Sequence, residues 1–409
     1  MRVCIVGSLP RPLGGVATYC YNLSSELSKL GTEVTFFDRN PNKDKIIPKG
    51  LNDYEMLNGS LSVFLKIFSN LTLSSLRSFI FLWIKLFAEC FKFRKNLSIP
   101  GILNVYIIAL SLFFNCSEKN IDLIHTQHAY SRSLSSLIVG NVLNIPVVVT
   151  IFASEFTSLN LKKLRPLAIH ICNSANHVIS ISEHTKKAAK KAGVNSEIEV
   201  IYLGVDTSFH SHYDISECRN KFNLVDEKVI LYVGWLIERK GPLLLLEAVA
   251  RLKDGNFKVF FIGPDHGLKE KMESYIRKLN LNSVYVIGSV DDLTLRRFYS
   301  LSDIFVFPTM TEDEGFGLVA VEAMASETVV IGSRIGAIPE VVRENESGFL
   351  FDVGDSNDLA NQISILLKND EFLYKMKKRA AEYVRQNFSW NFTAKATLNV
   401  YEKVVCAYG

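Results

Sequence analysis

The sequence predicts an α/β protein of two domains, each built on a parallel sheet that helices cover on both faces. Its 409 residues are too many for one ordinary hydrophobic core. Short apolar runs alternate with amphipathic segments along both halves, which is the pattern of strands and helices in such sheets. A polar, linker-like stretch over residues 206–226 follows the first half, so we place the domain boundary at Val205 and Asp206.

The spacing of apolar residues predicts the strands and helices of the amino-terminal half, residues 1–205. The predicted strands cover residues 3–6, 34–37, 123–124, 147–151, 177–181 and 198–202. The predicted helices cover residues 17–30, 131–143 and 183–192.

The carboxyl-terminal half repeats this alternation over residues 206–373, and residues 374–409 follow as two terminal helices. Its predicted strands cover residues 229–233, 258–262, 284–287, 304–307 and 328–332. Its predicted helices cover residues 243–252, 268–279, 293–301, 318–325 and 358–368. Asp291 and Asp292 are expected to cap the helix that starts at residue 293.

Residues 51–115 form an apolar insert in the first half. The stretch 79–93 is aromatic and aliphatic except for a narrow stripe of Lys85, Glu89 and Lys92 at i, i+4 and i+7. A membrane-spanning helix needs about 20 apolar residues, and these charges interrupt the run too early. Two interpretations remain open: a helix that lies in the plane of a membrane surface, or a helix buried in a large first domain.

Composition excludes several classes of protein. Hydrophobic residues make up 48% and charged residues 22%, so wholesale disorder is not expected. Seven cysteines lie scattered without a Cys-x-x-Cys pattern, which indicates reduced thiols in a cytoplasmic protein. Residues 3–7 form an apolar run too short for a signal peptide, and we interpret it as a first strand.

Charge is divided unequally between the halves. Residues 1–205 hold 22 Lys and Arg against 13 Asp and Glu, whereas residues 206–409 hold 24 against 29. A basic first half favours an anionic partner, either a membrane surface or a phosphorylated acceptor. No nucleic-acid-binding motif accompanies this charge, so no nucleic acid is expected as a partner.

The most informative segment runs from Glu314 to Glu322, with Gly315, Phe316, Gly317 and Leu318 between the two carboxylates. A buried strand over residues 304–307 precedes it, and a helix is expected from residue 316 onward, which puts Glu322 about two turns into that helix. The N–H groups of a helix start would then point at the same place as Glu314, which suits a phosphate and a hydroxyl-rich group beside it. An exposed helix face that merely carries two acids is the alternative interpretation.

Two further segments place glycine next to a helix start. Gly14 and Gly15 follow the first strand, where a backbone without side chains can approach an anion closely. Residues 234–241 follow another strand and end in Arg239, Lys240 and Gly241. No Asp-x-Asp pair ends a strand, so no metal site is expected.

These segments together resemble the donor-site signature of glycosyltransferase family 4, the retaining enzymes of GT-B fold. The resemblance extends from Met1 to about Trp390, with a gap near residues 50–120. It implies two facing Rossmann-like domains with a cleft between them, acceptor binding by residues 1–205 and donor binding by residues 206–373. It also implies that helices in 374–409 cross back to the first domain.

The resemblance implies roles for individual residues. Glu322 would accept hydrogen bonds from the ribose, and Glu314 with the amides of Phe316 and Gly317 would hold the transferred sugar. Lys240, the amides around Gly15 and Leu318, and Arg239 as a further cation would bind the diphosphate. Gly263 and Val290 lie in loops that would hold the base, and His128 would contact sugar hydroxyls. Glu314, Lys240 and His128 are therefore the candidate catalytic residues, with Gly315 in the donor-binding loop.

Three positions depart from the family pattern. Trp235 stands where the family usually has Arg, Phe152 where it usually has His, and Leu203 where it usually has Asn. Glu155 is a candidate to replace the contact missing at Phe152, and His125 and Gln127 are further candidates beside His128. These departures motivate an alternative, a catalytically inactive GT-B subunit that keeps the fold for binding.

The expected function is retaining transfer of a sugar, without metal or other cofactor, from a UDP- or GDP-sugar. The acceptor would be a glycan, a lipid-linked molecule or a phosphorylated molecule in the synthesis of cell-surface polysaccharide or glycolipid. The expected location is the cytoplasm, with peripheral contact at the inner face of the cell membrane as an open alternative.

Overall fold

A computed structural model describes residues 1–9, 14–38, 53–56, 73–206, 213–252 and 255–409. The chain divides into two compact units. The first unit comprises Met1–Tyr202 and Trp390–Gly409, and the second comprises Leu203–Ser389. The predicted domain boundary at Val205 lies three residues beyond the point where the chain leaves the first unit.

The first unit is built on a seven-stranded parallel sheet in the order β3-β2-β1-β4-β5-β6-β7. The strands are β1 (Arg2–Gly7), β2 (Glu33–Asp38), β3 (Asp53–Met56), β4 (Leu123–Gln127), β5 (Val147–Ile151), β6 (His177–Ser180) and β7 (Ile198–Val200). β1 and β4 pair in register, with Val3 opposite Leu123 and Val6 opposite Thr126. The chain switches direction across the sheet at this pair, and ligands of open α/β sheets bind at such points.

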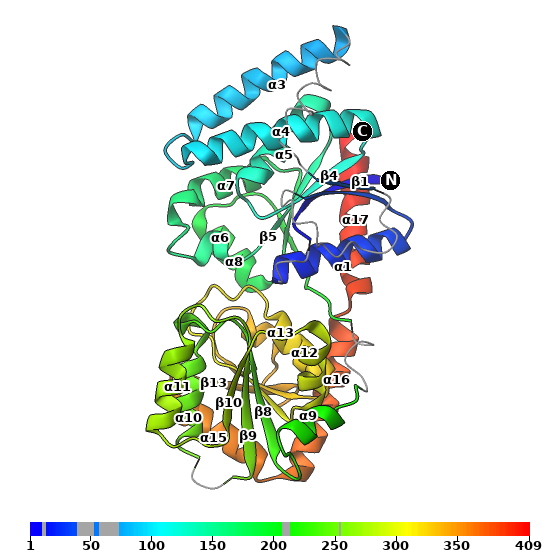
Figure 1. The fold of residues 1–409 in the computed structure, drawn as a ribbon. Coiled ribbons are helices and arrows are strands. Elements are labelled where there is room, and N and C mark those ends of the chain that lie inside the picture. Colours follow the sequence, from blue (N-terminus) through cyan, green and yellow to red (C-terminus); the bar gives the residue numbers. More distant parts are fainter. Residues whose placement is uncertain (10–13, 39–52, 57–72, 207–212, 253–254) are drawn as a thin grey trace. The chain divides into compact units, whose positions relative to one another are not determined.

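Helices flank this sheet (Figure 1). They are α1 (Gly15–Lys29), α3 (Leu73–Lys92), α4 (Ile99–Lys119), α5 (Ser131–Leu143), α6 (Ser154–Thr157), η1 (Lys162–Leu164), α7 (Arg165–Ser174), α8 (Glu183–Ala192) and the terminal α17 (Trp390–Tyr408). Local sequence fixes their ends: the Ser98 hydroxyl accepts from the amide of Gly101 at the start of α4, and Asn120 ends it with a positive φ of 47°.

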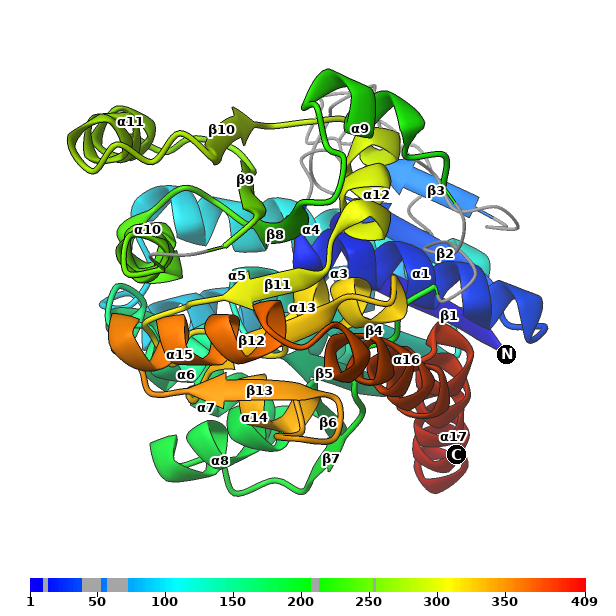
Figure 2. The ribbon, with the colours of Figure 1, turned by 90° about the horizontal axis from the view of Figure 1, so that it is seen from below.

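The second unit is built on a six-stranded parallel sheet in the order β10-β9-β8-β11-β12-β13, which can be followed in Figure 2. The strands are β8 (Lys228–Val233), β9 (Phe257–Ile262), β10 (Val284–Gly288), β11 (Ile304–Phe307), β12 (Val329–Ser333) and β13 (Gly348–Phe351). The helices are α9 (Ser216–Lys221), η2 (Glu238–Lys240), α10 (Pro242–Val249), α11 (Lys269–Lys278), α12 (Asp292–Leu301), α13 (Leu318–Ala325), α14 (Ile338–Val341), α15 (Ser356–Leu367) and α16 (Asp370–Asn387). Its switch point lies between β8 and β11.

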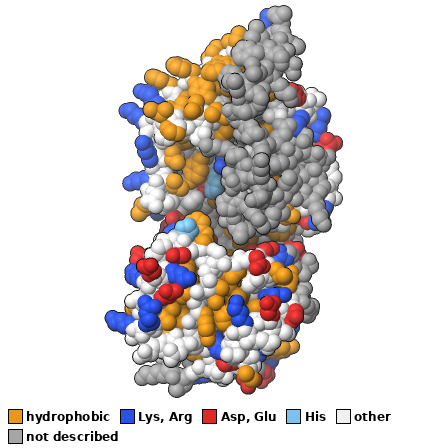
Figure 3. Space-filling model, viewed as in Figure 1, with side chains coloured by type: hydrophobic (Ala, Val, Ile, Leu, Met, Phe, Trp, Pro, Cys, Tyr) orange, Lys and Arg blue, Asp and Glu red, His pale blue; other side chains and the backbone are white. Residues whose placement is uncertain are grey.

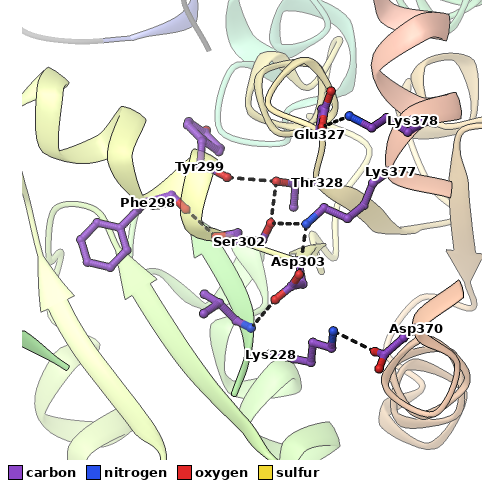
Figure 4. A network of polar contacts seen from close by, with 11 residues as sticks. Lys228, Phe298, Tyr299, Ser302, Asp303, Glu327, Thr328, Asp370, Lys377 and Lys378 are labelled. Atoms are coloured by element: carbon purple, nitrogen blue, oxygen red, sulfur yellow. Dashed lines mark hydrogen bonds and ion pairs between the residues drawn. The ribbon is translucent and has the colours of Figure 1, made fainter. Parts of the chain in front are cut away.

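A polar network at the amino end of β11 holds four elements of the second unit together (Figure 4). The Asp303 carboxylate accepts from the amide of Val229 at 2.9 Å and from Lys377 of α16 at 3.0 Å. The Thr328 hydroxyl is placed 3.0 Å from the carbonyl of Tyr299 in the last turn of α12. The network therefore fixes α12 and α16 against the end of the sheet where the strands begin, opposite their carboxyl ends.

The two terminal helices belong to different units. Helix α16 packs in the second unit and α17 in the first, where it lies beside α1. The segment 374–409, which we expected to cross back as a whole, therefore divides at Ser389 and Trp390.

The apolar insert contains β3 and two long helices, and its residues 51–52 and 57–72 lie outside the described part of the chain. Among the described residues, one helix, α4, is long and apolar enough to span a membrane. Val105, Ile108, Leu112 and Cys116 on α4 are buried in the core of the first unit, as expected of a core helix in a globular domain.

Candidate functional site

An ion pair joins two loops at the carboxyl ends of β8 and β11. The Lys240 ammonium lies 2.5 Å from Oε2 of Glu314, and both side chains are largely shielded from solvent. Gly241 permits this arrangement with a positive φ of 70°, because a Cβ there would lie 1.9 Å from the carbonyl oxygen of Pro308. The two residues that the sequence placed in one donor site, 74 positions apart, are thus in direct contact.

The loop after β11 leads into α13. Pro308 follows the strand, and Gly317 has a φ of 92°, close against the ring of Phe307. The helix begins at Leu318 rather than at residue 316, because the left-handed backbone of Gly317 cannot be part of a right-handed helix. Phe316 before it is buried and packs against Phe388 at a ring distance of 5.6 Å. No side chain caps the helix start, so its first N–H groups remain suited to an anion.

Glu322 lies just over one turn into α13, nearer its start than we expected. The Tyr299 hydroxyl, buried in α12, donates to Oε2 of Glu322 at 2.9 Å. Burial raises the pKa of Glu322 to about 7, and Asp292 adds to this, whereas Tyr299 and Arg296 oppose it. A carboxyl group that changes charge near neutral pH therefore lies at the start of this helix.

Trp235 occupies the end of β8 with 46% of its surface exposed. Its ring lies 4.6 Å from that of His266, at an angle of 34°. Arg239 in η2 is half-buried, and its carbonyl accepts from the amide of Met310 at 2.8 Å. An aromatic pair thus stands where the resemblance would place a guanidinium group.

The loops after β9 and β10 complete this edge of the second unit. Gly263 has a φ of 142°, and a Cβ there would meet the carbonyl of Gly234 at 2.0 Å. Val290 is half-buried between β10 and α12, and the next residue, Asp291, caps α12 through the amide of Thr294 as predicted. Gly315 is buried beside Glu314.

His128 lies at the carboxyl end of β4 in the first unit, with a positive φ of 63°. Its Nδ1 is 3.0 Å from Oε1 of Glu155, and its ring lies 4.5 Å from that of Phe152. Glu155 is buried and also accepts from the amide of Phe152 at 3.1 Å. Its carboxylate therefore orients His128 and does not itself replace the contact that the sequence suggested was missing at Phe152.

Two other polar residues of β4 point into the first unit. His125 contacts Tyr401 and Thr150 at 2.5 and 2.7 Å, and burial lowers its pKa to about 3, so it is neutral and structural. Gln127 is buried, and both polar atoms of its amide have no hydrogen-bond partner within the part of the chain that the structure describes. Gly15 is the first residue of α1, and residues 12–13 before it lie outside the described residues.

Sequence reasoning missed Tyr299, His266 and the inward orientation of Glu155. Tyr299 lies in a predicted helix, but its contact with Glu322 spans 23 residues and depends on how two helices pack. Among the described residues, no group of three or more His, Cys, Asp or Glu side chains could hold a metal ion.

Two protein families match the chain. The family described as "Glycosyltransferase Family 4" matches residues 13–209, and that described as "Glycosyl transferases group 1" matches residues 214–386. The chain therefore belongs to glycosyltransferase family 4, and it is a glycosyltransferase.

Among its relatives, an uncharacterized glycosyltransferase of Methanocaldococcus jannaschii is 29% identical over 76% of this chain and 83% of its own. The N-acetyl-alpha-D-glucosaminyl L-malate synthase of Bacillus anthracis is 24% identical over 66% of this chain and 72% of its own.

Solved structures confirm the fold. HepE of Anabaena, crystallised with UDP and glucose, has a TM-score of 0.76 at 18% identity and covers 98% of this chain and 100% of its own. Sucrose-phosphate synthase of Thermosynechococcus elongatus has a TM-score of 0.76 at 21% identity and covers 99% of each chain. The predicted class, α/β with two Rossmann-like domains of the GT-B type, is confirmed.

Proposed function

We propose that the protein is a retaining glycosyltransferase that takes a sugar from a UDP- or GDP-sugar bound to the second unit. The contact between Lys240 and Glu314 carries this proposal. It places a cation and a carboxylate beside the uncapped start of α13, so one edge of the sheet offers partners for both a diphosphate and sugar hydroxyls.

A bound donor would replace part of the contact between Lys240 and Glu314. Its diphosphate would bind Lys240 and the amides at Leu318, with Arg239 as a further cation and the amide of Gly15 as a further hydrogen-bond donor. Glu314, Gly315, Phe316 and Gly317 would hold the sugar. Glu322 would accept from the ribose, and the backbone at Gly263 and Val290 would hold the base.

The proposed transfer uses neither a side-chain nucleophile nor a metal. The bond from the sugar's anomeric carbon to the diphosphate breaks as the bond to the acceptor oxygen forms on the same face. The acceptor proton passes to the leaving diphosphate. Lys240 and the helix start stabilise the charge on that leaving group. His128, held by Glu155, would contact the sugar or the acceptor.

The acceptor would be a glycan, a lipid-linked molecule or a phosphorylated molecule of cell-surface polysaccharide or glycolipid synthesis. The basic balance of residues 1–205 supports an anionic acceptor. We place the protein in the cytoplasm with peripheral membrane contact, which the six buried free cysteines and the apolar insert support.

Calorimetry and thermal shift against UDP-, GDP- and ADP-sugars without metal test the donor site. One donor should raise the melting temperature by mass action. Lys240→Ala should weaken its binding about 10- to 100-fold, since a charge-assisted contact contributes about 1.5–3 kcal/mol. Glu322→Ala should weaken it similarly, whereas Lys278→Ala on the exposed surface of α11 should leave it unchanged.

Binding and transfer measurements distinguish the enzyme from a second candidate, an inactive binding subunit. Trp235 favours this second candidate, because it forms an aromatic pair with His266 where the family usually has the guanidinium group of an arginine. Donor binding followed by transfer with retained anomeric configuration supports the enzyme. Binding of no sugar nucleotide by the folded protein would overturn the donor site and favour the inactive subunit.

A further inference from the structure

Helix α3 carries an apolar stripe that faces solvent. Ile80, Ile84, Phe87 and Phe91 follow one another at i, i+4, i+7 and i+11, which puts them on one side of the helix. We call these four residues the outer face of α3. Ile84, Phe87 and Phe91 expose 60%, 66% and 56% of their surface. Large apolar side chains gathered in this way mark a binding surface more often than single exposed ones do.

The opposite side of α3 is anchored in the first unit. Leu82, Leu86 and Cys90 are buried in its core, and α3 packs on both α4 and α5. Trp83 lies between the two sides, with its ring 5.4 Å from that of Tyr106 on α4. The helix is therefore held in place by one apolar side while it presents a second one to solvent.

Basic residues border the outer face. They are Arg77, Lys85, Arg94 and Lys95, whereas the ammonium of Lys92 lies 3.2 Å from Nδ1 of His170 on α7. Two of them fold over exposed rings, Lys85 at 5.3 Å from Phe81 and Arg94 at 4.0 Å from Phe91. The acid of this segment, Glu89, turns toward α7, where it lies 3.1 Å from Nε2 of His170.

The basic border continues beyond the helix. The Asn96 amide donates to the carbonyl of Lys163 at 2.8 Å, which brings η1 with its exposed Lys162 and Lys163 to the end of α3. Figure 3 shows hydrophobic side chains gathered on the α3 and α4 side of the first unit, with Lys and Arg side chains along their margin.

We propose that the outer face of α3 docks on an anionic lipid bilayer, with the helix in the plane of the surface. Aromatic and aliphatic side chains would enter the boundary between headgroups and acyl chains, and the basic border would contact lipid phosphates. A symmetric pairing of two chains through this face would instead bring two basic borders together. The inference deepens the proposed function, on which it rests, by naming the membrane partner of the unit assigned to the acceptor.

Co-sedimentation of the full chain with vesicles tests the proposal. The chain should bind vesicles that contain phosphatidylglycerol and should bind pure phosphatidylcholine vesicles at least tenfold less. The double substitution Ile84→Ser with Phe87→Ser should lower the partition coefficient about tenfold or more, because two large apolar groups no longer enter the lipid. Lys85→Gln with Lys95→Gln should lower it about fivefold or more.

Matched controls come from the second unit, where Ile365 and Tyr374 are 49% and 63% exposed. Ile365→Ser with Tyr374→Ser should bind vesicles as the unchanged protein does, and melting curves should show that all variants are folded. Equal vesicle binding by the Ile84 and Phe87 variant would overturn the proposal. So would absence of binding by the unchanged protein, or a dimer in solution that this variant abolishes. Donor affinity measured without vesicles reports on the proposed function separately.

Discussion

At the residue scale, the contact between Lys240 and Glu314 forms the centre of the proposed donor site. Taking two charges out of water is costly, and their attraction repays that cost only with good geometry. Here Lys240 and Glu314 keep 21% and 14% of their side-chain surface exposed, and the Lys240 ammonium also lies 5.7 Å from the ring of Phe307. A diphosphate that competes for Lys240 must therefore be accompanied by a new partner for Glu314, and the sugar hydroxyls of the donor supply one.

Glu322 gives a prediction that depends on pH. Its pKa of about 7 lies above the ordinary value of 4.5. Between these two pH values, the carboxyl group of Glu322 holds a proton in the folded state that it has lost in the unfolded state. This stabilising contribution is complete below about pH 4.5 and is lost as the pH rises through 7. Glu322→Gln should therefore raise the free energy of unfolding at pH 8 by about 1–3 kcal/mol and change it little at pH 4.5.

Urea unfolding at the two pH values measures this effect. Donor binding should change in the opposite sense, because ionised Glu322 is the better acceptor for ribose hydroxyls. The unchanged protein should bind donor more tightly at pH 8 than at pH 6, and Glu322→Gln should bind weakly at both. Equal stability of the two proteins at pH 8 would contradict the raised pKa.

At the element scale, the short η2 helix is fixed against the loop after β11. Gly241→Ala places a methyl group 1.9 Å from the Pro308 carbonyl oxygen and requires a φ of 70° that alanine rarely adopts. It should lower the free energy of unfolding by about 2–4 kcal/mol and weaken donor binding, because Lys240 precedes it.

Gly354→Ala is the matched control for Gly241→Ala. Its φ of 78° is similar, but a Cβ there meets nothing within 4 Å. It should cost about 1 kcal/mol and leave donor binding unchanged. Equal effects of the two substitutions, measured by urea unfolding and calorimetry, would show that close approach at Gly241 does not position Lys240.

At the scale of the whole molecule, the last helix completes the first unit. Tyr401 of α17 is buried and reaches His125 on β4, while Trp390 lies against Tyr19 of α1. The chain therefore forms most of one unit, then the whole of the other, and returns to finish the first.

Tyr401→Ala should lower the stability of the first unit by about 3–5 kcal/mol, since it leaves a cavity and removes the partner of His125 Nδ1. Hydrogen exchange resolves where the loss occurs. Amides of β4, β5 and α1 should lose protection, whereas those of β8 and β11 should keep it. Tyr374→Ala, on the exposed surface of α16, is the control and should change neither set. Equal loss of protection in both units would contradict the assignment of α17.

The sequence alone determined the two parallel sheets and most of their elements, because apolar runs and helical periods are local properties of the chain. β3 and β13 were not predicted, since Asp53–Met56 is polar and Gly348–Phe351 offers only three apolar residues after a glycine. The resemblance likewise singled out Lys240, Glu314 and Glu322 as candidate residues, although it gave no distance between them.

Only the tertiary structure decided which groups touch. Tyr299 meets Glu322, and Glu155 turns inward to His128, because helices and loops distant in the chain pack together. The stretch 79–93 shows the same limit: its periodicity predicted a helix that is apolar except for one narrow charged stripe. Only its packing showed that Leu82 and Leu86 are buried while Ile84 and Phe87 face solvent. A sequence fixes the period of a helix, but which side is covered depends on neighbours that other segments supply.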